Sequence, residues 1–247
     1  MRIYTTELGH NYSSYSFGYT IHAATEPDEA LAPVYEQGFL PYSAKPTKED
    51  LFYMARSLRL RASDFSPTSE NRRVLQKFDG QFTYDYLDPA AYRADPQIRA
   101  LFLDYFKQLH GEGVMPAARL DDLFNKDLPL RIARYMKEDG TPVGYVLEVV
   151  EDSFIHYWFS AYELEYAFTS LGMWLMIDAA RRAKEEGRTY LYVGTGYGEK
   201  ARYKTNLPNI TFWDGTLWVE NEKELRAHMK TDDDRVMNLS SALYDSF

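Results

Sequence analysis

Alternating hydrophobic residues along the chain predict several β-strands. In Tyr12–His22, the residues Tyr15, Phe17, Tyr19 and Ile21 recur at every second position, which is the period of a half-buried strand. Similar alternation or short apolar runs predict further strands at residues 81–86, 130–136, 143–150, 154–160, 189–193 and 216–219. The stretch 51–61 is ambiguous between a strand and a helix.

Apolar residues at three- and four-residue spacing predict the helices. One helix covers residues 98–109 and ends at Gly111, and another covers 171–186 and ends at Gly187. Start signals, in which an oxygen-bearing residue precedes acidic ones, predict further helices. These are expected at residues 25–37, from 66–70 onward, and at 222–230.

The order of these elements indicates the fold class. The second half of the chain alternates helices with strands and contains one hairpin, which favours a mixed sheet with helices on both faces, an α/β or α+β fold. Two Asp-Pro pairs, at residues 88–89 and 95–96, punctuate the chain before this half. We therefore expect a smaller N-terminal region over residues 1–88 and a main domain over residues 89–247.

Composition narrows the classes of function. The 247 residues carry 28 Lys and Arg against 37 Asp and Glu, and the net charge of −9 counts against broad nonspecific binding of nucleic acid but allows a local basic patch. Cysteine is absent, which excludes disulfides, thiolate metal sites and cysteine nucleophiles. Because we find no long apolar run and no secretory signal at the first residues, we expect a cytoplasmic protein without a membrane partner.

Two other kinds of site have weak signals. The five histidines lack the spacing of a metal-binding pair, so we expect no metal site. His156 lies inside a strand pattern and is interpreted as a hydrogen-bonded packing residue. The glycine-rich stretch 194–198 follows a strand and fits a phosphate-binding loop or a simple connecting loop, and it completes neither the dinucleotide fingerprint nor a P-loop.

A series of sequence elements, in the right order, resembles the arginyl- and leucyl-tRNA–protein transferases of the N-degron pathway. The elements are a Gly-Phe pair at 38–39, Arg59 on a strand, the segment Phe65–Arg73, the Ser-Leu-Gly helix start at 170–172, a Tyr-x-Gly strand end at 192–194 and the pair Tyr203-Lys204. The resemblance covers roughly residues 16–206. The chain departs from the family in lacking cysteines near residues 42–55. It also has Glu163 and Glu165 around Leu164, where the family usually has two Asp around a Pro.

The resemblance implies a fold like that of the GCN5-related N-acyltransferases (GNAT), in which a V-shaped gap in the sheet holds the acyl donor. It further implies aminoacyl-tRNA as the co-substrate, without another cofactor, and the α-amine of a protein or peptide N-terminus as the acceptor. An aminoacyl ester is already activated. Such an enzyme must therefore align the two reactants, remove a proton from the amine and stabilise an oxyanion.

The same resemblance assigns the candidate site residues. Glu163 and Glu165 are the candidate catalytic residues, either as proton acceptors or as partners of a cationic group, and solvated loop acids are the alternative interpretation. Basic residues are expected to contact phosphates and tyrosines to stack on the terminal adenine, with surface charge and core packing as the alternatives. The expected substrate-binding residues are Arg56, Arg59, Arg72, Arg73, Tyr157, Tyr162, Ser170, Gly172, Lys200, Arg202 and Lys204.

Two other functions stay open. One is an acyl-CoA-dependent N-acyltransferase on the same scaffold, because a fold does not determine the donor. The helix start at 169–174 disfavours it, since it lacks the Arg or Gln of those enzymes and places Trp174 where a bulky ring would obstruct a phosphate. The other is a noncatalytic binding module that retains the fold.

Overall fold

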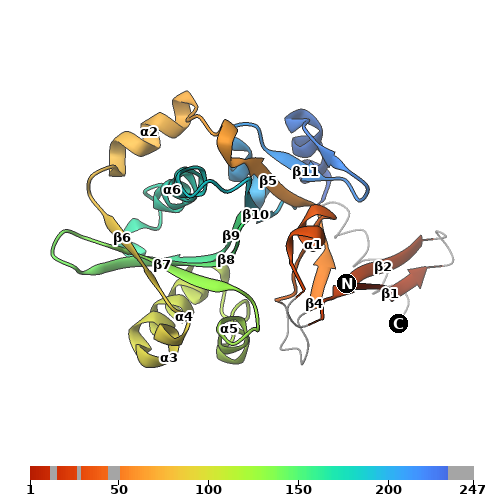
Figure 1. Cartoon of the computed structure of the whole chain (residues 1–247), viewed down its shortest axis with the longest axis horizontal. Helices are drawn as coiled ribbons and strands as arrows, with labels where there is room; N and C mark the ends of the chain where they lie inside the picture. Colours follow the sequence, from red (N-terminus) through yellow and green to blue (C-terminus); the bar gives the residue numbers. More distant parts are fainter. Residues whose placement is uncertain (12–15, 27–28, 44–50, 233–247) are drawn as a thin grey trace.

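Two β-sheets organise the chain (Figure 1). The computed structural model describes residues 1–11, 16–26, 29–43 and 51–232, and it describes their side chains except at 8–11 and 16–17. The larger sheet has the strand order β12-β11-β5-β10-β9-β8-β7-β6, and the smaller one has the order β1-β2-β4-β3. The strands of the larger sheet are β5 (Ser57–Arg61), β6 (Thr83–Leu87), β7 (Leu130–Met136), β8 (Pro142–Glu151), β9 (Phe154–Tyr162), β10 (Tyr190–Thr195), β11 (Thr211–Trp213) and β12 (Trp218–Val219). Those of the smaller sheet are β1 (Arg2–Asn11), β2 (Ser16–Ala24), β3 (Phe39–Pro41) and β4 (Leu51–Met54).

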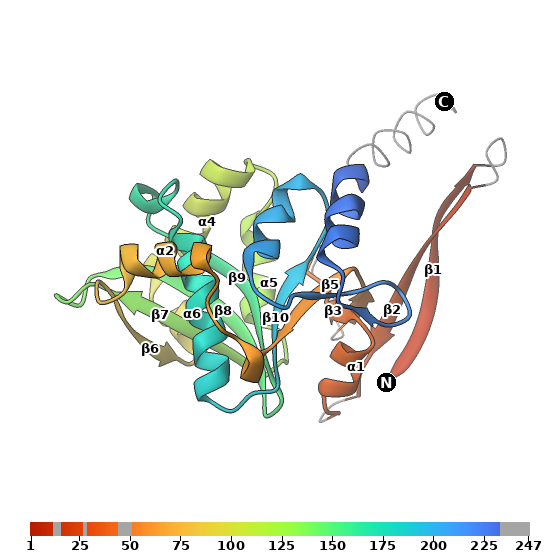
Figure 2. The same ribbon diagram turned by 90° about the horizontal axis from the view of Figure 1, so that it is seen from above.

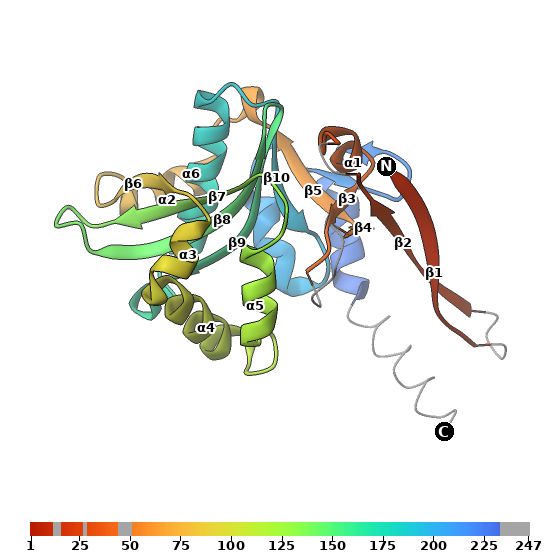
Figure 3. The same ribbon diagram turned by 60° about the horizontal axis from the view of Figure 1, so that its bottom comes forward.

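Helices cover both faces of the larger sheet, as the sequence predicts. Figures 1 and 3 show α2 and α6 on one face and α3, α4 and α5 on the other. The helices are α1 (Ala32–Glu36), α2 (Ser69–Phe78), α3 (Ala90–Ala94), α4 (Pro96–His110), α5 (Ala117–Phe124) and α6 (Leu171–Glu185), with short 3-10 helices η1 (Ala62–Asp64), η2 (Leu164–Tyr166) and η3 (Glu199–Asn206). None of the helices within the described ranges is long and apolar enough to cross a bilayer.

The smaller sheet lies beside the larger one and ends in a projecting hairpin. Figure 2 shows β1 and β2 extending away from the rest of the molecule. A second core cluster joins the two sheets, where Tyr35, Phe39 and Phe52 pack with Phe154 and Tyr192. Strands β5 and β6, which precede residue 88, belong to the larger sheet. The division of the chain into domains at residue 88 stays a prediction.

Most of the predicted elements in the second half are confirmed. Strands β7 to β10 and helices α4 and α6 occupy the predicted stretches to within about three residues, and Gly111 and Gly187 follow the two helices with positive φ angles. The signal at 66–70 is confirmed as a capping box, because Thr68 and Asn71 exchange side-chain and backbone hydrogen bonds at the start of α2. Strands at 83–87 and 218–219 and helical residues 222–232 also agree with the prediction.

Other predictions near the N-terminus need correction. The ambiguous stretch 51–61 forms two strands that belong to different sheets, β4 and β5. Strand β2 confirms the alternation at Ser16–Ala24, whereas Tyr12–Tyr15 lie outside the described residues, and β1 was not predicted because its sequence is largely polar.

The predicted helix over residues 25–37 is wrong in its extent, because α1 covers only Ala32–Glu36. Its first amides find a partner far along the chain. The carboxylate of Glu151, at the end of β8, accepts hydrogen bonds from the backbone of Leu31 (2.7 Å) and Ala32 (3.2 Å). This carboxylate takes the place of the local cap that the sequence suggested.

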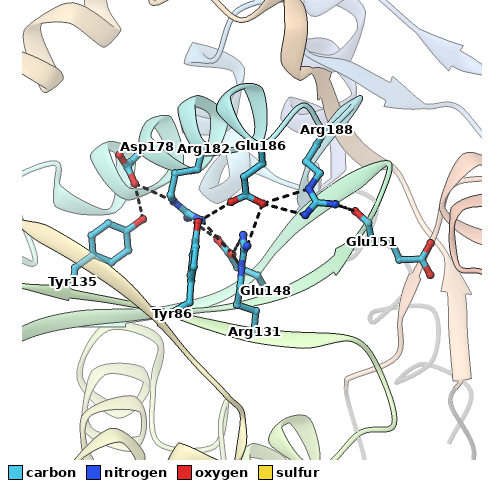
Figure 4. Close-up of polar contacts among 9 residues, drawn as sticks. All are labelled: Tyr86, Arg131, Tyr135, Glu148, Glu151, Asp178, Arg182, Glu186 and Arg188. Atoms are coloured by element: carbon cyan, nitrogen blue, oxygen red, sulfur yellow. Dashed lines mark hydrogen bonds and ion pairs between the residues drawn. The ribbon is translucent and has the colours of Figure 1, made fainter.

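A buried network of charged groups attaches α6 to the larger sheet (Figure 4). Arg182 of α6 donates to Glu148 of β8 at 2.6 Å, and these side chains are 1% and 0% exposed. Arg131 of β7 reaches the same carboxylate at 2.9 Å and also contacts Glu186 at 3.1 Å. Because two guanidinium groups share one carboxylate, the buried charge of Glu148 is fully compensated by hydrogen-bonded partners.

We expect Glu148→Gln to lower the free energy of unfolding by about 3–5 kcal/mol, because it removes the buried carboxylate that Arg131 and Arg182 share and leaves an excess of positive charge, even though Arg182 keeps Asp178 as a partner at 3.1 Å. The measurement is urea unfolding at pH 7. Glu199→Gln is the matched control, since it breaks an exposed pair with Arg202 at 3.3 Å and should lower the same quantity by no more than about 1 kcal/mol. Equal effects of the two substitutions would contradict an anchoring role of the network.

Candidate functional site

Strands β9 and β10 pair over three residues and then separate. They run parallel, and their ladder joins Phe154 with Tyr190, Ile155 with Leu191 and His156 with Tyr192. Beyond His156, β9 continues along β8 as far as Tyr162, while β10 continues along β5, and no further residue pair joins β9 to β10 although both are fully described. The larger sheet is therefore split on one side of this ladder, in agreement with the V-shaped gap that the family resemblance implies.

A β-bulge in β9 lies at the point of separation. Leu147 pairs with Phe159 and Glu148 pairs with Tyr157, so Trp158 is an extra residue in β9. Neighbouring residues of a regular strand point to opposite faces. The bulge bends the strand and redirects its side chains, and all residues from 156 to 160 line the opening.

A cavity of about 660 Å³ occupies the opening between the separated strands. That volume lies within the usual range for small-ligand sites, roughly 300–1,000 Å³. Its wall is rich in aromatic rings, which come from Tyr53, Tyr105, Phe106, Tyr157, Trp158, Phe159, Tyr162 and Tyr203. Leu40 and Pro41 of β3 and Tyr53 of β4 also line it, as does Ser43, so the smaller sheet contributes to the wall of a cavity in the larger one.

His156 forms part of the cavity wall and is fully buried. Its Nδ1 lies 2.9 Å from the hydroxyl oxygen of Tyr35, a residue of α1. Its Nε2 has no hydrogen-bond partner among the described residues. Burial, with a smaller effect of the Lys204 ammonium, lowers the pKa of His156 to about 3. The imidazole is therefore neutral near pH 7.

Lys204 supplies an ammonium group to the same cavity. Its Nζ donates to the backbone oxygen of Thr195 at 2.9 Å. Within the described part of the chain, no carboxylate lies within ion-pair distance of it. Desolvation lowers the pKa of Lys204 to about 8, so the group remains mostly charged at pH 7 in surroundings that disfavour the charge.

The start of α6 forms another wall of the cavity. Ser170 adopts a left-handed backbone conformation with a φ of 74° and precedes the first turn. Gly172 follows, and a Cβ added there would lie 2.8 Å from the hydroxyl oxygen of Tyr162. Glycine therefore allows α6 to begin directly against the ring of Tyr162.

Trp174 does not obstruct this helix start, and the expectation that it would is wrong. The indole Nε1 donates to Asp79 at 2.9 Å, and the ring packs against Phe78, Phe82 and Tyr135. The side chain is 4% exposed and does not line the cavity. The helical spacing in the sequence did not predict where the Trp174 ring points, because that depends on which side of α6 contacts the sheet.

The structure brings together five of the predicted substrate-binding residues. The residues in question are Tyr157, Tyr162, Ser170, Gly172 and Lys204, which all line the cavity. His156 was interpreted as a packing residue, and its Nδ1 contact agrees with that reading. Its unpartnered Nε2 was not predicted, because a strand pattern gives no sign of where the sheet separates.

Arg56 and Arg59 lie outside the cavity wall and contact groups of the protein itself. Arg56 donates to Asp232 at 2.7 Å and to the backbone of Gly196 at 3.1 Å. The Arg59 guanidinium lies 3.9 Å from the ring centres of both Tyr190 and Trp218 and is buried there. Their predicted contact with phosphates stays a prediction.

The other predicted basic residues lie on the surface. Arg72 and Lys200 are exposed, and Arg72 donates to a backbone oxygen of residue 67 at 2.7 Å. Arg73 pairs with Glu70 at 3.2 Å, and Arg202 pairs with Glu199. None of these four basic residues lines the cavity, and their contact with RNA also stays a prediction.

Glu163 and Glu165 lie between β9 and α6, in the segment where the sequence placed them. Both are exposed, and neither lines the cavity. Glu165 pairs with Lys137 at 3.2 Å. Their catalytic role therefore stays a prediction. The described residues also contain no cluster of three His, Asp or Glu side chains that could hold a metal ion.

Comparisons with known proteins agree with this geometry. Residues 72–205, more than half of the chain, match the family described as the acetyltransferase (GNAT) domain. An aspartate/glutamate leucyltransferase of Cereibacter sphaeroides is 27% identical over 178 residues, which are 66% of this chain and 61% of the relative. One of Methylorubrum populi is 30% identical over 152 residues, which are 56% of this chain and 60% of the relative. The chain thus spans about three fifths of the length of these relatives.

Among solved structures, the chain is similar to L-PGS of Bacillus licheniformis. The two chains share 15% sequence identity, and the TM-score is 0.42. The alignment covers 66% of this chain and 49% of the other.

We expect Lys204→Met to stabilise the protein more at pH 7 than at pH 10. The depressed pKa of about 8 means that the folded state releases this proton earlier than the unfolded state does. The charged Lys204 side chain therefore lowers the free energy of unfolding by its full amount below pH 8, and this loss becomes smaller as the pH rises toward the ordinary lysine pKa of 10.5. Urea unfolding of parent and variant at several pH values gives the difference directly. A difference that does not change between pH 7 and pH 10 would show that the ammonium is not desolvated.

Proposed function

We propose that this chain, which belongs to the acetyltransferase (GNAT) domain family, transfers an aminoacyl group from aminoacyl-tRNA to the α-amine of a protein or peptide N-terminus. The observation that carries the proposal is the aromatic cavity at the separation of β9 and β10. Two related proteins named aspartate/glutamate leucyltransferases support it. So does the ordered series of motifs shared with tRNA–protein transferases.

The names of these relatives suggest the two groups that are joined. We propose leucine as the transferred amino acid and an N-terminal Asp or Glu as the acceptor residue. The wall of the cavity supports an apolar aminoacyl group, because it is rich in aromatic side chains. Among the described lining residues, Glu70 is the one that carries a carboxylate. A cationic aminoacyl group would meet the Lys204 ammonium there without a nearby counter-charge.

The chemistry needs positioning more than a strong base. The transfer breaks the C–O bond of the aminoacyl ester and forms a C–N bond. The proton that the amine loses is balanced by one that the departing ribose oxygen takes up. Because the ester is activated, alignment of the amine with the carbonyl contributes most of the rate. The Ser170 and Gly172 backbone and the tyrosines Tyr157 and Tyr162 supply walls that would fix this alignment.

We expect the purified protein to transfer radiolabelled leucine from leucyl-tRNA to a peptide that begins with Asp, and to transfer no acetyl group from acetyl-CoA. Binding of the tRNA should weaken as salt increases, because released counterions drive such binding. Mass spectrometry of the peptide identifies the added group. An acetylated peptide would favour the acyl-CoA alternative, and binding without any product would favour a noncatalytic module.

We expect Gly172→Ala to lower the transfer rate by about 10- to 100-fold, because the new Cβ displaces Tyr162 and misplaces the substrate. The double variant Gly172→Ala/Tyr162→Phe removes the hydroxyl that the Cβ would meet, so it should recover part of this loss. Single-turnover kinetics with melting curves as a folding control provide the comparison. A double variant slower than Gly172→Ala would show that this close approach does not limit the reaction.

A further inference from the structure

Two polar groups at the inner wall of the cavity lack the partners that such groups normally have. His156 is fully buried, and its Nε2 has no hydrogen-bond partner among the described residues. The Lys204 ammonium has one hydrogen bond, to the backbone oxygen of Thr195, and no carboxylate partner within the described ranges. Buried polar groups are nearly always hydrogen-bonded, so a ligand group is the expected partner of the His156 imidazole. The Lys204 side chain is intermediate in exposure, and its ammonium has further N–H groups that can donate to the same ligand.

The contact with Tyr35 determines what His156 offers to that ligand. The hydroxyl of Tyr35 is buried, and its hydrogen needs an acceptor. Nδ1 of His156, at 2.9 Å, is the acceptor that the described residues provide. In a neutral imidazole, an accepting Nδ1 leaves the proton on Nε2. His156 therefore carries an N–H donor on the same cavity wall as the Lys204 ammonium, whose charge acts on the imidazole.

We propose that Lys204 and His156 form a carboxylate-binding site that holds the acidic side chain of the acceptor's first residue. This assignment rests on the proposed function, which supplies the acceptor. Two donors, one of them cationic, match the two oxygens of a carboxylate. Glu70 is the acidic residue among the described lining side chains, and it is half-exposed and paired with Arg73. It does not provide the missing counter-charge.

The location of the donors favours a carboxylate over a phosphodiester. His156 is 0% exposed and its Nε2 is buried, so a group that accepts its proton must be small and terminal. A side-chain carboxylate meets that condition, whereas the phosphate of a nucleic-acid backbone has a ribose on each side. No arginine lines the cavity among the described residues, although arginine is the usual bidentate partner of phosphates.

The test compares two acceptor peptides that differ only in a first residue of Asp or Asn. We expect the parent to prefer Asp, and Lys204→Met to lower kcat/KM for the Asp peptide by about 10- to 100-fold, mainly through KM. The preference, measured as the ratio of kcat/KM for the Asp peptide to that for the Asn peptide, should fall by about the same factor. Lys184→Met is the matched control, because this lysine also donates to a backbone oxygen, that of Phe65, but lies outside the cavity. It should keep the preference of the parent.

Tyr35→Phe tests the role of the imidazole proton. Without the hydroxyl, Nδ1 can carry the proton and Nε2 then presents a lone pair, which repels a carboxylate. We expect the preference for Asp over Asn to fall about tenfold, as for the loss of one hydrogen bond to a charged group. A variant that loses activity equally with both peptides would assign Tyr35 a purely structural role and would overturn this part of the proposal.

Binding without tRNA separates this proposal from the proposed function. Calorimetry with the dipeptides Asp-Ala and Asn-Ala should show tighter binding of Asp-Ala to the parent but not to Lys204→Met. If no peptide is a substrate and this preference is still found, the transfer reaction is wrong and the carboxylate site stands. If transfer occurs and Lys204→Met retains the Asp preference, the site is wrong. If Lys204→Met weakens tRNA binding and leaves the preference for Asp unchanged, the lysine contacts a phosphate of the tRNA, and the proposed carboxylate site is also wrong.

Discussion

The short ladder between β9 and β10 is the constraint on which the rest of the structure depends. Parallel strands with unbroken pairing would leave no space between them, whereas these two share three residue pairs and then diverge. The divergence is tolerated because each strand keeps an antiparallel neighbour on its outer side, β8 for β9 and β5 for β10. Backbone groups along the inner edges then face the cavity rather than another strand, and such groups are suited to orient a substrate.

The charged network beneath α6 supports this opening from the side. The helix begins at the cavity with Ser170 and is held three turns later, where Arg182 reaches Glu148. Trp174 and Asp79 add a contact between these two points. A buried ion pair of this kind contributes little net stability compared with apolar packing, but its geometry is specific. We infer that it determines where α6 starts relative to β9, and therefore the shape of one cavity wall.

The sequence was sufficient for the elements whose pattern is local. The strands from Leu130 to Thr195 and the helix after Ser170 follow from periodicity and from glycines at helix ends. The five predicted residues in the cavity came from the resemblance to the transferase family and not from periodicity. Contacts between distant residues were not predictable. Glu151 caps α1 from 120 residues away, and Asp232 engages Arg56 from 176 residues away. Neither pairing leaves a periodic signal.

Because the net charge of the protein is negative, selection of an anionic substrate would require a local site with a positive charge. At −9, its overall field repels both tRNA and acidic peptides, and surface charges are screened over about 10 Å at ordinary ionic strength. The exposed Arg73 and Arg202 each have a glutamate partner, which weakens their outward field further. The Lys204 ammonium lies in a partly desolvated cavity without such a partner, where charge interactions are stronger than in water. If the protein selects an acidic group, as we propose, Lys204 is the one Lys or Arg among the described lining residues that can attract it inside the cavity.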